Sequence, residues 1–186
     1  MYTRSKNLQA LQSQKMITNA LLALMKVYPY SDITITQICQ EAKVVRQTFY
    51  RNFETKLDIL ELYLDDMAKK YESDYFDAKL DAYQILKDFF DFSLLYKDLF
   101  KLLEKNNLFF LLNKVITMNM FNFSYIPKIT AKIEASKLDA YVSDFIASTI
   151  CSIFSLWVKN NFQETTEALA DLAKVFLMGV NTNKVG

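Results

Sequence analysis

Glycine is nearly absent from this chain of 186 residues, and its scarcity restricts the possible folds more than any other feature. The only two glycines, Gly179 and Gly186, lie at the extreme C-terminus. Phosphate-cradling loops and dinucleotide-binding turns need glycine where the backbone approaches a ligand or takes a positive φ. Only two prolines are present, so a turn-rich β sandwich or barrel is also disfavoured. We therefore predict an all-α fold.

The chain also lacks histidine, which removes most of the common catalytic and metal sites. Without it there is no Ser-His-Asp triad, no Cys-His dyad and no histidine-ligated zinc. Cys39 and Cys151 are too few for a disulfide framework or a zinc knuckle, and we expect both to be buried free thiols. No other reactive residues show a defined catalytic spacing. We expect a protein that is not an enzyme and that has no cofactor and no metal.

The longest apolar run without a charge covers residues 145–158, between Asp144 and Lys159. It has 14 residues, whereas spanning a bilayer takes about 18 to 20. The N-terminal apolar stretch has no signal cleavage site after it. We read the long run as a core helix and expect a cytoplasmic protein without membrane contact.

Charge is distributed unevenly along the chain. Residues 1–56 carry eight basic and three acidic side chains, a net charge of +5. The rest carries 14 basic and 18 acidic side chains, a net charge of −4. A basic first third on an acidic body indicates an anionic partner at one end, and nucleic acid is the leading candidate.

The first 79 residues have the periodicity of four helices. Apolar residues three and four apart predict a helix over 8–28, ended by Pro29. Thr34 and Gln37 have capping-box spacing and begin a short helix that runs to about Ala42. After a three-residue break, another short helix covers 46–53, and a long one runs from the cap at 55 to about Lys79. Two short helices joined by a three-residue turn and preceded by a supporting helix form a helix-turn-helix arrangement.

The same segment carries a known signature. Its residues are Ile33-Thr34-Ile35 with Ile38, then Ala42, Val44, Thr48-Phe49-Tyr50 with Phe53, and Lys56-Leu57 with Leu60. In these residues the chain resembles the DNA-binding region of the TetR family of bacterial repressors, over about residues 8–62. The resemblance implies a helix-turn-helix head at 1–55 and a helical ligand-binding and dimerisation body at 56–186.

DNA recognition needs long or forked side chains at the groove and donors for the phosphates. Arg46 and Gln47 begin the second helix of the motif, where arginine suits guanine and glutamine suits adenine. Thr34 is a helix cap first and a phosphate contact second, and the resemblance adds Thr36 and Asn52 to the contacts. The predicted DNA-binding residues are Thr34, Thr36, Arg46, Gln47, Thr48, Tyr50, Arg51, Asn52 and Lys56.

Two positions depart from the family pattern. Lys43 stands where the family usually has glycine, because the first helix of the motif ends there in a left-handed conformation. Lysine at positive φ costs roughly 1 kcal/mol relative to glycine. Val45 stands where a serine-like cap is usual, and its side chain cannot accept a hydrogen bond. We expect the fold to survive both changes and the entry angle of the recognition helix to be affected.

The body is helical and rich in aromatic residues, with helices predicted over 82–96, 98–105, 108–120, 137–160 and 165–178. Eight of the fifteen phenylalanines lie between Ile85 and Tyr125. Two interpretations stay open: the rings line a pocket for a hydrophobic ligand, as the resemblance implies, or they fill a helical core. The candidate pocket residues are Phe89, Phe92, Tyr96, Phe110, Asn113, Met120 and Trp157.

The predicted helix over 137–160 has small residues at four-residue spacing beside a wide apolar stripe. Small side chains allow helices to approach closely, and a helix with more apolar surface than one core covers usually meets a partner. The resemblance implies that the partner is a second copy of the chain. The predicted dimer-interface residues are Ser143, Ala147, Cys151, Ser155, Leu169, Leu172 and Phe176.

Together these features are typical of a transcriptional regulator that binds double-stranded DNA. In the family pattern it would be a repressor that binds a palindromic operator as a homodimer and is released by a small apolar or aromatic ligand. One alternative is a transcriptional adaptor whose body binds a partner protein. Another is a helical carrier of apolar molecules without a DNA role. An operator shift assay and a pull-down with and without that DNA distinguish the three.

Overall fold

The computed structural model describes residues 7–75, 81–120 and 139–178, and the regular elements in these ranges are all helices. The predicted all-α fold is confirmed for this part of the chain, which contains no strand. The chain forms two compact units, Met1–Met67 and Ala68–Gly186. The division falls inside one long helix, α4 (Lys56–Asp74), so this helix contributes to both units.

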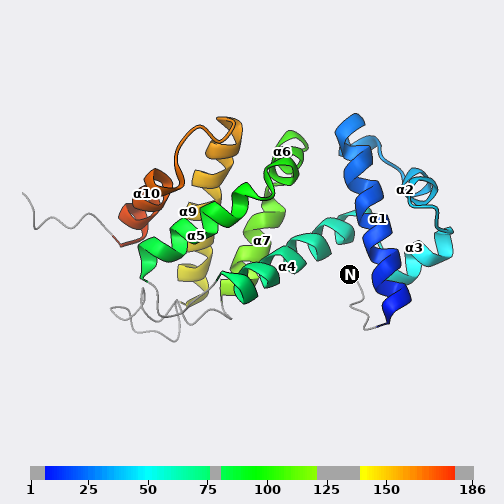
Figure 1. Ribbon diagram of the computed structural model, residues 1–186, viewed down its shortest axis with the longest axis horizontal. Helices are drawn as coiled ribbons and strands as arrows, with labels where there is room; N and C mark the ends of the chain where they lie inside the picture. The colour runs from blue at the N-terminus through cyan, green and yellow to red at the C-terminus, as the bar shows by residue number, and fades with distance from the viewer. Residues whose placement is uncertain (1–6, 76–80, 121–138, 179–186) are drawn as a thin grey trace, which may run out of the picture. The chain divides into compact units, whose positions relative to one another are not determined.

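The first unit contains three helices and the start of α4 (Figure 1). The helices before α4 are α1 (Leu8–Val27), α2 (Ile35–Glu41) and α3 (Arg46–Asn52), with a 3-10 turn, η1 (Tyr30–Asp32), between α1 and α2. Helix α1 contacts both α2 and α3, because its apolar stripe faces them. Fully buried side chains form the core of this unit, among them Ile17, Leu21, Ile38, Phe49 and Phe53.

The sequence-based bounds of these helices agree with the structure to within one or two residues. The segment expected to be a loop after Pro29 contains the 3-10 turn η1 instead. Helix α4 is described as far as Asp74. Its expected end near Lys79 lies outside the described residues.

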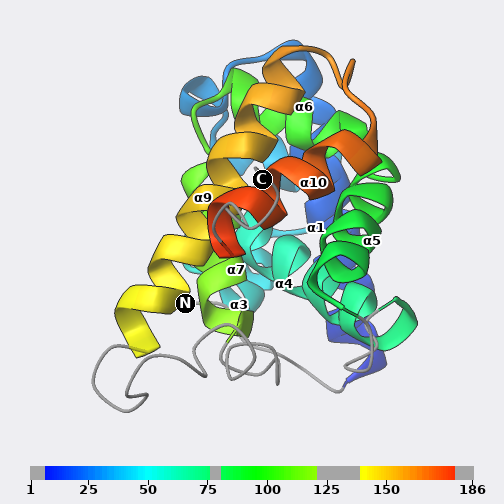
Figure 2. The same cartoon turned by 90° about the vertical axis from the view of Figure 1, so that its left-hand side faces the viewer.

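The described residues of the second unit form five further helices besides the end of α4. They are α5 (Ala82–Leu94), α6 (Lys97–Lys105), α7 (Phe110–Met120), α9 (Asp139–Lys159) and α10 (Thr166–Met178). Helix α9 contacts α6, α7 and α10, and α10 also packs along α5 (Figure 2). Helices α5 and α7 are shorter than expected, and the expected start of α9 at 137 lies outside the described residues.

An aromatic cluster, formed by Phe89, Phe90, Phe100, Phe109, Phe154 and Trp157, fills the centre of the second unit. Phe154 is fully buried at its middle. The centroid of its ring lies 4.6 Å from that of Phe100, 5.5 Å from that of Phe109 and 5.8 Å from that of Phe89. These pairs have the edge-to-face geometry that aromatic rings prefer. The cluster joins α5, α6 and α9 with the segment before α7.

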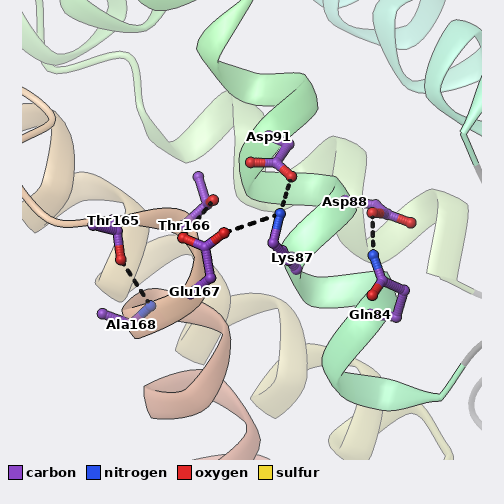
Figure 3. Close-up of polar contacts among 8 residues, drawn as sticks. All are labelled: Gln84, Lys87, Asp88, Asp91, Thr165, Thr166, Glu167 and Ala168. Carbon is purple, nitrogen blue, oxygen red and sulfur yellow. Dashed lines mark hydrogen bonds and ion pairs between the residues drawn. The ribbon is translucent and has the colours of Figure 1, made fainter.

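A polar cluster connects α5 to α10 (Figure 3). The Nζ of Lys87 lies 2.6 Å from Asp91 Oδ2 on its own helix and 3.2 Å from Glu167 Oε1 in the first turn of α10. Hydrogen bonds to Asp91 and then to Glu167 raise the pKa of Lys87 above its ordinary value. At the start of α10, the Thr165 hydroxyl accepts a hydrogen bond of 3.3 Å from the Ala168 N–H. The cluster thereby links the N-terminal end of α10 to the middle of α5.

Three helices end in the same hydrogen-bonded motif, although no glycine is present there. At the end of α2, the Val44 N–H donates to Cys39 O at 3.0 Å and the Lys43 N–H donates to Gln40 O at 3.1 Å. This is the Schellman pattern, in which one residue has the left-handed conformation. That residue is Lys43 after α2, Asn107 after α6 and Asn161 after α9, with φ values of 53°, 55° and 56°.

Candidate nucleic-acid interface

Helix α2 begins with the predicted capping box. The Gln37 N–H donates to Thr34 Oγ1 at 3.3 Å, and the Thr34 N–H donates to Gln37 Oε1 at 2.8 Å. The two bonds satisfy donors that the first turn of a helix otherwise leaves open. Thr34 is therefore confirmed as a helix cap. Its predicted phosphate contact stays a prediction.

The turn between α2 and α3 has Lys43 at the left-handed position where glycine is usual. Lys43 has a φ of 53°, which confirms the left-handed conformation predicted for it. Ala42 and Ile38 are buried directly before it, so the end of α2 is anchored in the core of the first unit. The Lys43 side chain is exposed, which places a positive charge on the turn.

Helix α3 begins without a side-chain cap, as predicted for Val45. The Val45 carbonyl oxygen accepts from the N–H groups of Thr48 at 2.9 Å and Phe49 at 3.3 Å. One side of the helix is anchored by Phe49 and Phe53, whose rings are buried against the other helices of the unit. Burial of these two rings fixes which side of α3 faces solvent.

The solvent-facing side of α3 carries the residues predicted to read DNA. Arg46, Gln47, Tyr50 and Arg51 are all exposed, and we call these four residues the recognition face. Their spacing of one, three and one residues puts them on one continuous strip of a helix with 3.6 residues per turn. Thr48, predicted with them, lies half-buried at the edge of the strip. The face offers two guanidinium groups, one amide and one phenol.

Arg46 is held by a residue of the preceding helix. Its Nη2 donates a hydrogen bond to the hydroxyl oxygen of Thr36, which lies in the first turn of α2. Burial raises the pKa of the Cys39 thiol, and the charge of Arg46 opposes that rise. Residues 36 and 39 lie on the same side of α2, since they are three apart in a helix. Both observations place the guanidinium beside α2.

Asn52 is buried, whereas a DNA contact would require its side chain to be exposed. Its side chain is only 3% exposed, and its Nδ2 donates to the Thr48 carbonyl oxygen at 2.7 Å. Burial withdraws it from the recognition face, because the last turn of α3 rotates residue 52 towards the core. Asparagine is polar, so its residue type does not indicate burial. Its position three residues after the buried Phe49 does.

Lys56 is more enclosed than sequence reasoning suggested. Its Nζ donates to the carbonyl oxygens of Ile33 at 2.8 Å and Ser31 at 3.2 Å, and also to that of Tyr30. The same atom lies 4.3 Å from the centroid of the Tyr30 ring. Burial lowers the pKa of Lys56, and the charge of Asp32 opposes that change. Lys56 is the first residue of α4, and its ammonium group thus ties the start of this helix to the η1 segment.

The predicted pocket residues of the second unit come from α5, α7 and α9 and from the turn after α5, and the pocket itself stays a prediction. Phe89 and Trp157 belong to the aromatic cluster, while Phe92 and Tyr96 pair with each other at 5.1 Å between ring centroids. Phe110 is exposed. Asn113 donates to Ser148 Oγ at 3.1 Å, which connects α7 to α9, and the Met120 side chain lies outside the described residues.

The row of small residues on α9 faces the interior of its own chain. Ala147 is fully buried and Cys151 nearly so, and Ser155 donates to Glu104 Oε2 of α6 at 3.0 Å. The close approach that small residues permit is used between helices of one chain. Ala147 and Cys151 are therefore covered in the single chain, and their role in a dimer interface stays a prediction. The Ser143 side chain lies outside the described residues.

The exposed apolar residues of α9 and α10 include some that were predicted for an interface and some that were not. Of the residues predicted for an interface, Leu169 is buried, while Leu172 and Phe176 are exposed. Phe145 and Leu156 were missed, although their exposed fractions are 59% and 62%. We call the following set the apolar face: Tyr141, Phe145, Leu156, Leu172, Val175 and Phe176.

In the part of the chain that the structure describes, no helix has the length and apolar character needed to cross a membrane. Within those same residue ranges, acidic and cysteine side chains form no group able to hold a metal ion.

The described residues form a helix-turn-helix head and an all-helical body, the arrangement that the resemblance to the TetR family implied. Solved structures have the same fold. The TetR transcriptional regulator from Streptococcus agalactiae 2603V matches with a TM-score of 0.64 and 17% identity, over 91% of this chain and 95% of that one. The fatty acid degradation regulator FadR from Bacillus halodurans matches with a TM-score of 0.55 and 16% identity, over 96% and 99%. The chain has the TetR-type fold.

A similar protein is found at the sequence level as well. The chain is 27% identical over 142 residues to the HTH-type dhaKLM operon transcriptional activator DhaS of Lactococcus lactis subsp. lactis (strain IL1403), covering 75% of this chain and 71% of that protein. A solved structure of the dihydroxyacetone kinase operon activator DhaS matches with a TM-score of 0.56 and 19% identity, over 89% and 94%. No protein-family model matches the chain. All these relatives are named as regulators or activators, and none as an enzyme.

Proposed function

We propose that the chain is a transcriptional regulator that binds double-stranded DNA through the recognition face. The observation that carries this proposal is the exposure of Arg46 and Gln47 at the first turn of α3, on a helix held in place by buried rings. That turn is the end of a recognition helix that enters the major groove, and both side chains form paired hydrogen bonds with bases. The net charge of +5 on residues 1–56 favours an anionic partner at this end.

The proposal includes a homodimer formed through the apolar face. Six large apolar side chains are exposed on two helices that contact each other. Contiguous apolar patches beyond a few hundred Å² are uncommon on soluble monomers. A twofold dimer also suits a palindromic operator, because one head alone makes few phosphate contacts and binds weakly. The interface residues that we propose are therefore the exposed residues of the apolar face.

Two candidates remain for what controls DNA binding. The first is a repressor released by a small apolar or aromatic ligand, as the sequence signature implied. The second is an adaptor whose body takes a partner protein. Two observations favour the second: the rings around Phe154 pack against one another, and the relative from Lactococcus lactis is named as an activator. A filled core leaves recognition to the surface of the body.

The test of DNA binding uses the full chain and duplex DNA. Selection from a random-sequence library by the wild-type protein should yield a palindromic consensus, and a fragment carrying it should shift in electrophoresis. The same selection with Arg46→Ala and Gln47→Ala combined should lose that consensus. A wild-type protein that enriches no sequence contradicts the proposal. Thermal melting with a panel of apolar ligands, and pull-down from the native lysate with and without the selected DNA, then separate the two candidates for control.

A further inference from the structure

The hydrogen bond between Arg46 and Thr36 joins the two helices of the motif at their DNA-facing ends. Arg46 is the first residue of α3 and Thr36 the second of α2. The two residues are ten apart in sequence, so their bond links α2 and α3 in addition to the turn at Lys43. Arg46 itself is exposed, while Thr36 is half-buried and therefore more firmly placed.

We infer that Thr36 is a positioning residue for Arg46, fixing the guanidinium in the orientation in which it reads a base. This inference rests on the proposed DNA-binding function and names a determinant of its specificity. A free arginine has many rotamers, and ordering it on binding costs affinity and selectivity. A bond from one Nη removes most of that freedom before DNA arrives. The other donors of the planar fork stay available for a guanine edge.

The chemistry of the hydroxyl group makes Thr36 well suited to this role. A threonine oxygen accepts from Arg46 and keeps its single proton for another acceptor. A cationic donor polarises the hydroxyl and makes that proton a better hydrogen-bond donor. Thr36 at the start of α2 then contacts a phosphate oxygen with the proton while its oxygen holds the guanidinium. The contact with the DNA phosphate and the arginine that reads a base are thereby linked through one hydroxyl group.

The discriminating test is a thermodynamic cycle on the full-length protein. The probe is the duplex that wild-type protein selects from a random library, together with its single-base-pair variants. Thr36→Val keeps the shape of the side chain and removes the hydroxyl. It should lower discrimination at the base pair read by Arg46 by about three- to tenfold, while discrimination at other base pairs changes little. Thr36→Ser keeps the hydroxyl and should restore discrimination.

Arg46→Ala provides the second arm of the cycle. In its background, Thr36→Val should no longer change discrimination at that base pair, because the residue that Thr36 positions is gone. Thermal melting of each variant separates misfolding from loss of positioning, and Thr36→Ala replaces Thr36→Val if the latter fails to fold. A wild-type protein that selects no DNA contradicts both the proposed function and this inference. A wild-type protein that selects DNA, with Thr36→Val weakening every duplex equally or not at all, overturns this inference alone.

Discussion

The ammonium group of Lys56 donates to the Ile33 carbonyl oxygen at 2.8 Å, across 23 residues of sequence. Ile33 lies at the end of the η1 segment, directly before the cap of α2. Lys56 begins α4, so the bond ties the start of the long helix to the start of the helix-turn-helix motif. The contact gives Lys56 a structural task that competes with a phosphate contact.

Lys56→Met should therefore destabilise the first unit. Three backbone carbonyls lose a charged donor, and we expect a loss of about 1 to 3 kcal/mol in the free energy of unfolding. Urea denaturation followed by circular dichroism measures it, with Lys56→Arg as the variant that keeps a charge. A pure phosphate contact predicts the opposite pattern: unchanged stability, and a salt dependence of DNA binding reduced by about one unit.

Lys43→Gly should stabilise the first unit by a few tenths to about 1 kcal/mol. Glycine takes the left-handed conformation without steric cost, whereas lysine at a φ of 53° does not. Asn107→Gly, in the same motif after α6, is a matched control. Its gain should be smaller, because asparagine tolerates this conformation better than lysine. A lower melting temperature for Lys43→Gly would show that the lysine side chain makes a stabilising contact.

Arg46→Ala and Gln47→Ala should each relax base preference at one position of the operator. A lost bidentate contact costs about 1 to 3 kcal/mol in discrimination. Arg51→Ala, on the same recognition face but further along α3, should instead weaken all duplexes about equally. Competition binding with single-base-pair variants measures the difference. Equal losses on every duplex for all three variants would show that the face contacts only the backbone.

Phe145→Glu and Phe176→Glu should convert a dimer into a monomer. Each puts a charge on a residue whose ring is more than half exposed in the single chain. Sedimentation should give a mass near twice 21.7 kDa for wild-type protein and near 21.7 kDa for the variants. Phe110→Glu is the matched control, because that ring is equally exposed on α7 and lies outside the apolar face. Wild-type protein that sediments as a single chain contradicts the dimer.

The buried thiol of Cys151 should make stability fall in alkali. Burial raises the pKa of Cys151 from 9.0 to about 12, so the unfolded chain releases this proton earlier than the folded one. Between those two values the folded state binds more protons, and stability decreases as pH rises. The advantage of wild-type protein over Cys151→Ala should therefore shrink by about 1 kcal/mol between pH 8 and pH 10. An advantage that stays constant would show that the thiol ionises equally in both states.

The first unit was largely predictable because its signals are short-range. The capping box of Thr34 and Gln37, the left-handed Lys43 and the uncapped Val45 each depend on neighbours within a few residues. Asn52 and Lys56 were placed less well: the burial of Asn52 follows from the turn of α3 around Phe49, whereas the partners of Lys56 come from a distant segment. No spacing in the sequence indicates that a lysine will reach three carbonyls more than twenty residues away.

The second unit was less predictable from the sequence, because the inward side of a helix with several apolar sides depends on tertiary packing. Helix α9 has both a row of small residues and large apolar side chains on several sides, and periodicity alone does not say which side faces inward. Packing against α6 and α7 decides it: Ala147 faces inward and Phe145 faces outward. The left-handed Asn107 and Asn161 were likewise overlooked, because without glycine the ends of α6 and α9 carry a weaker signal.

The aromatic ring of Phe154 also makes this protein a starting point for engineering. It touches rings from several helices and is fully enclosed, so Phe154→Ala removes a benzene-sized volume from the middle of the second unit. An apolar hole of that kind stays dry and accepts small aromatic guests, at a stability cost of about 3 to 5 kcal/mol that the guest partly restores. A filled interior would then become a binding site for small aromatic molecules.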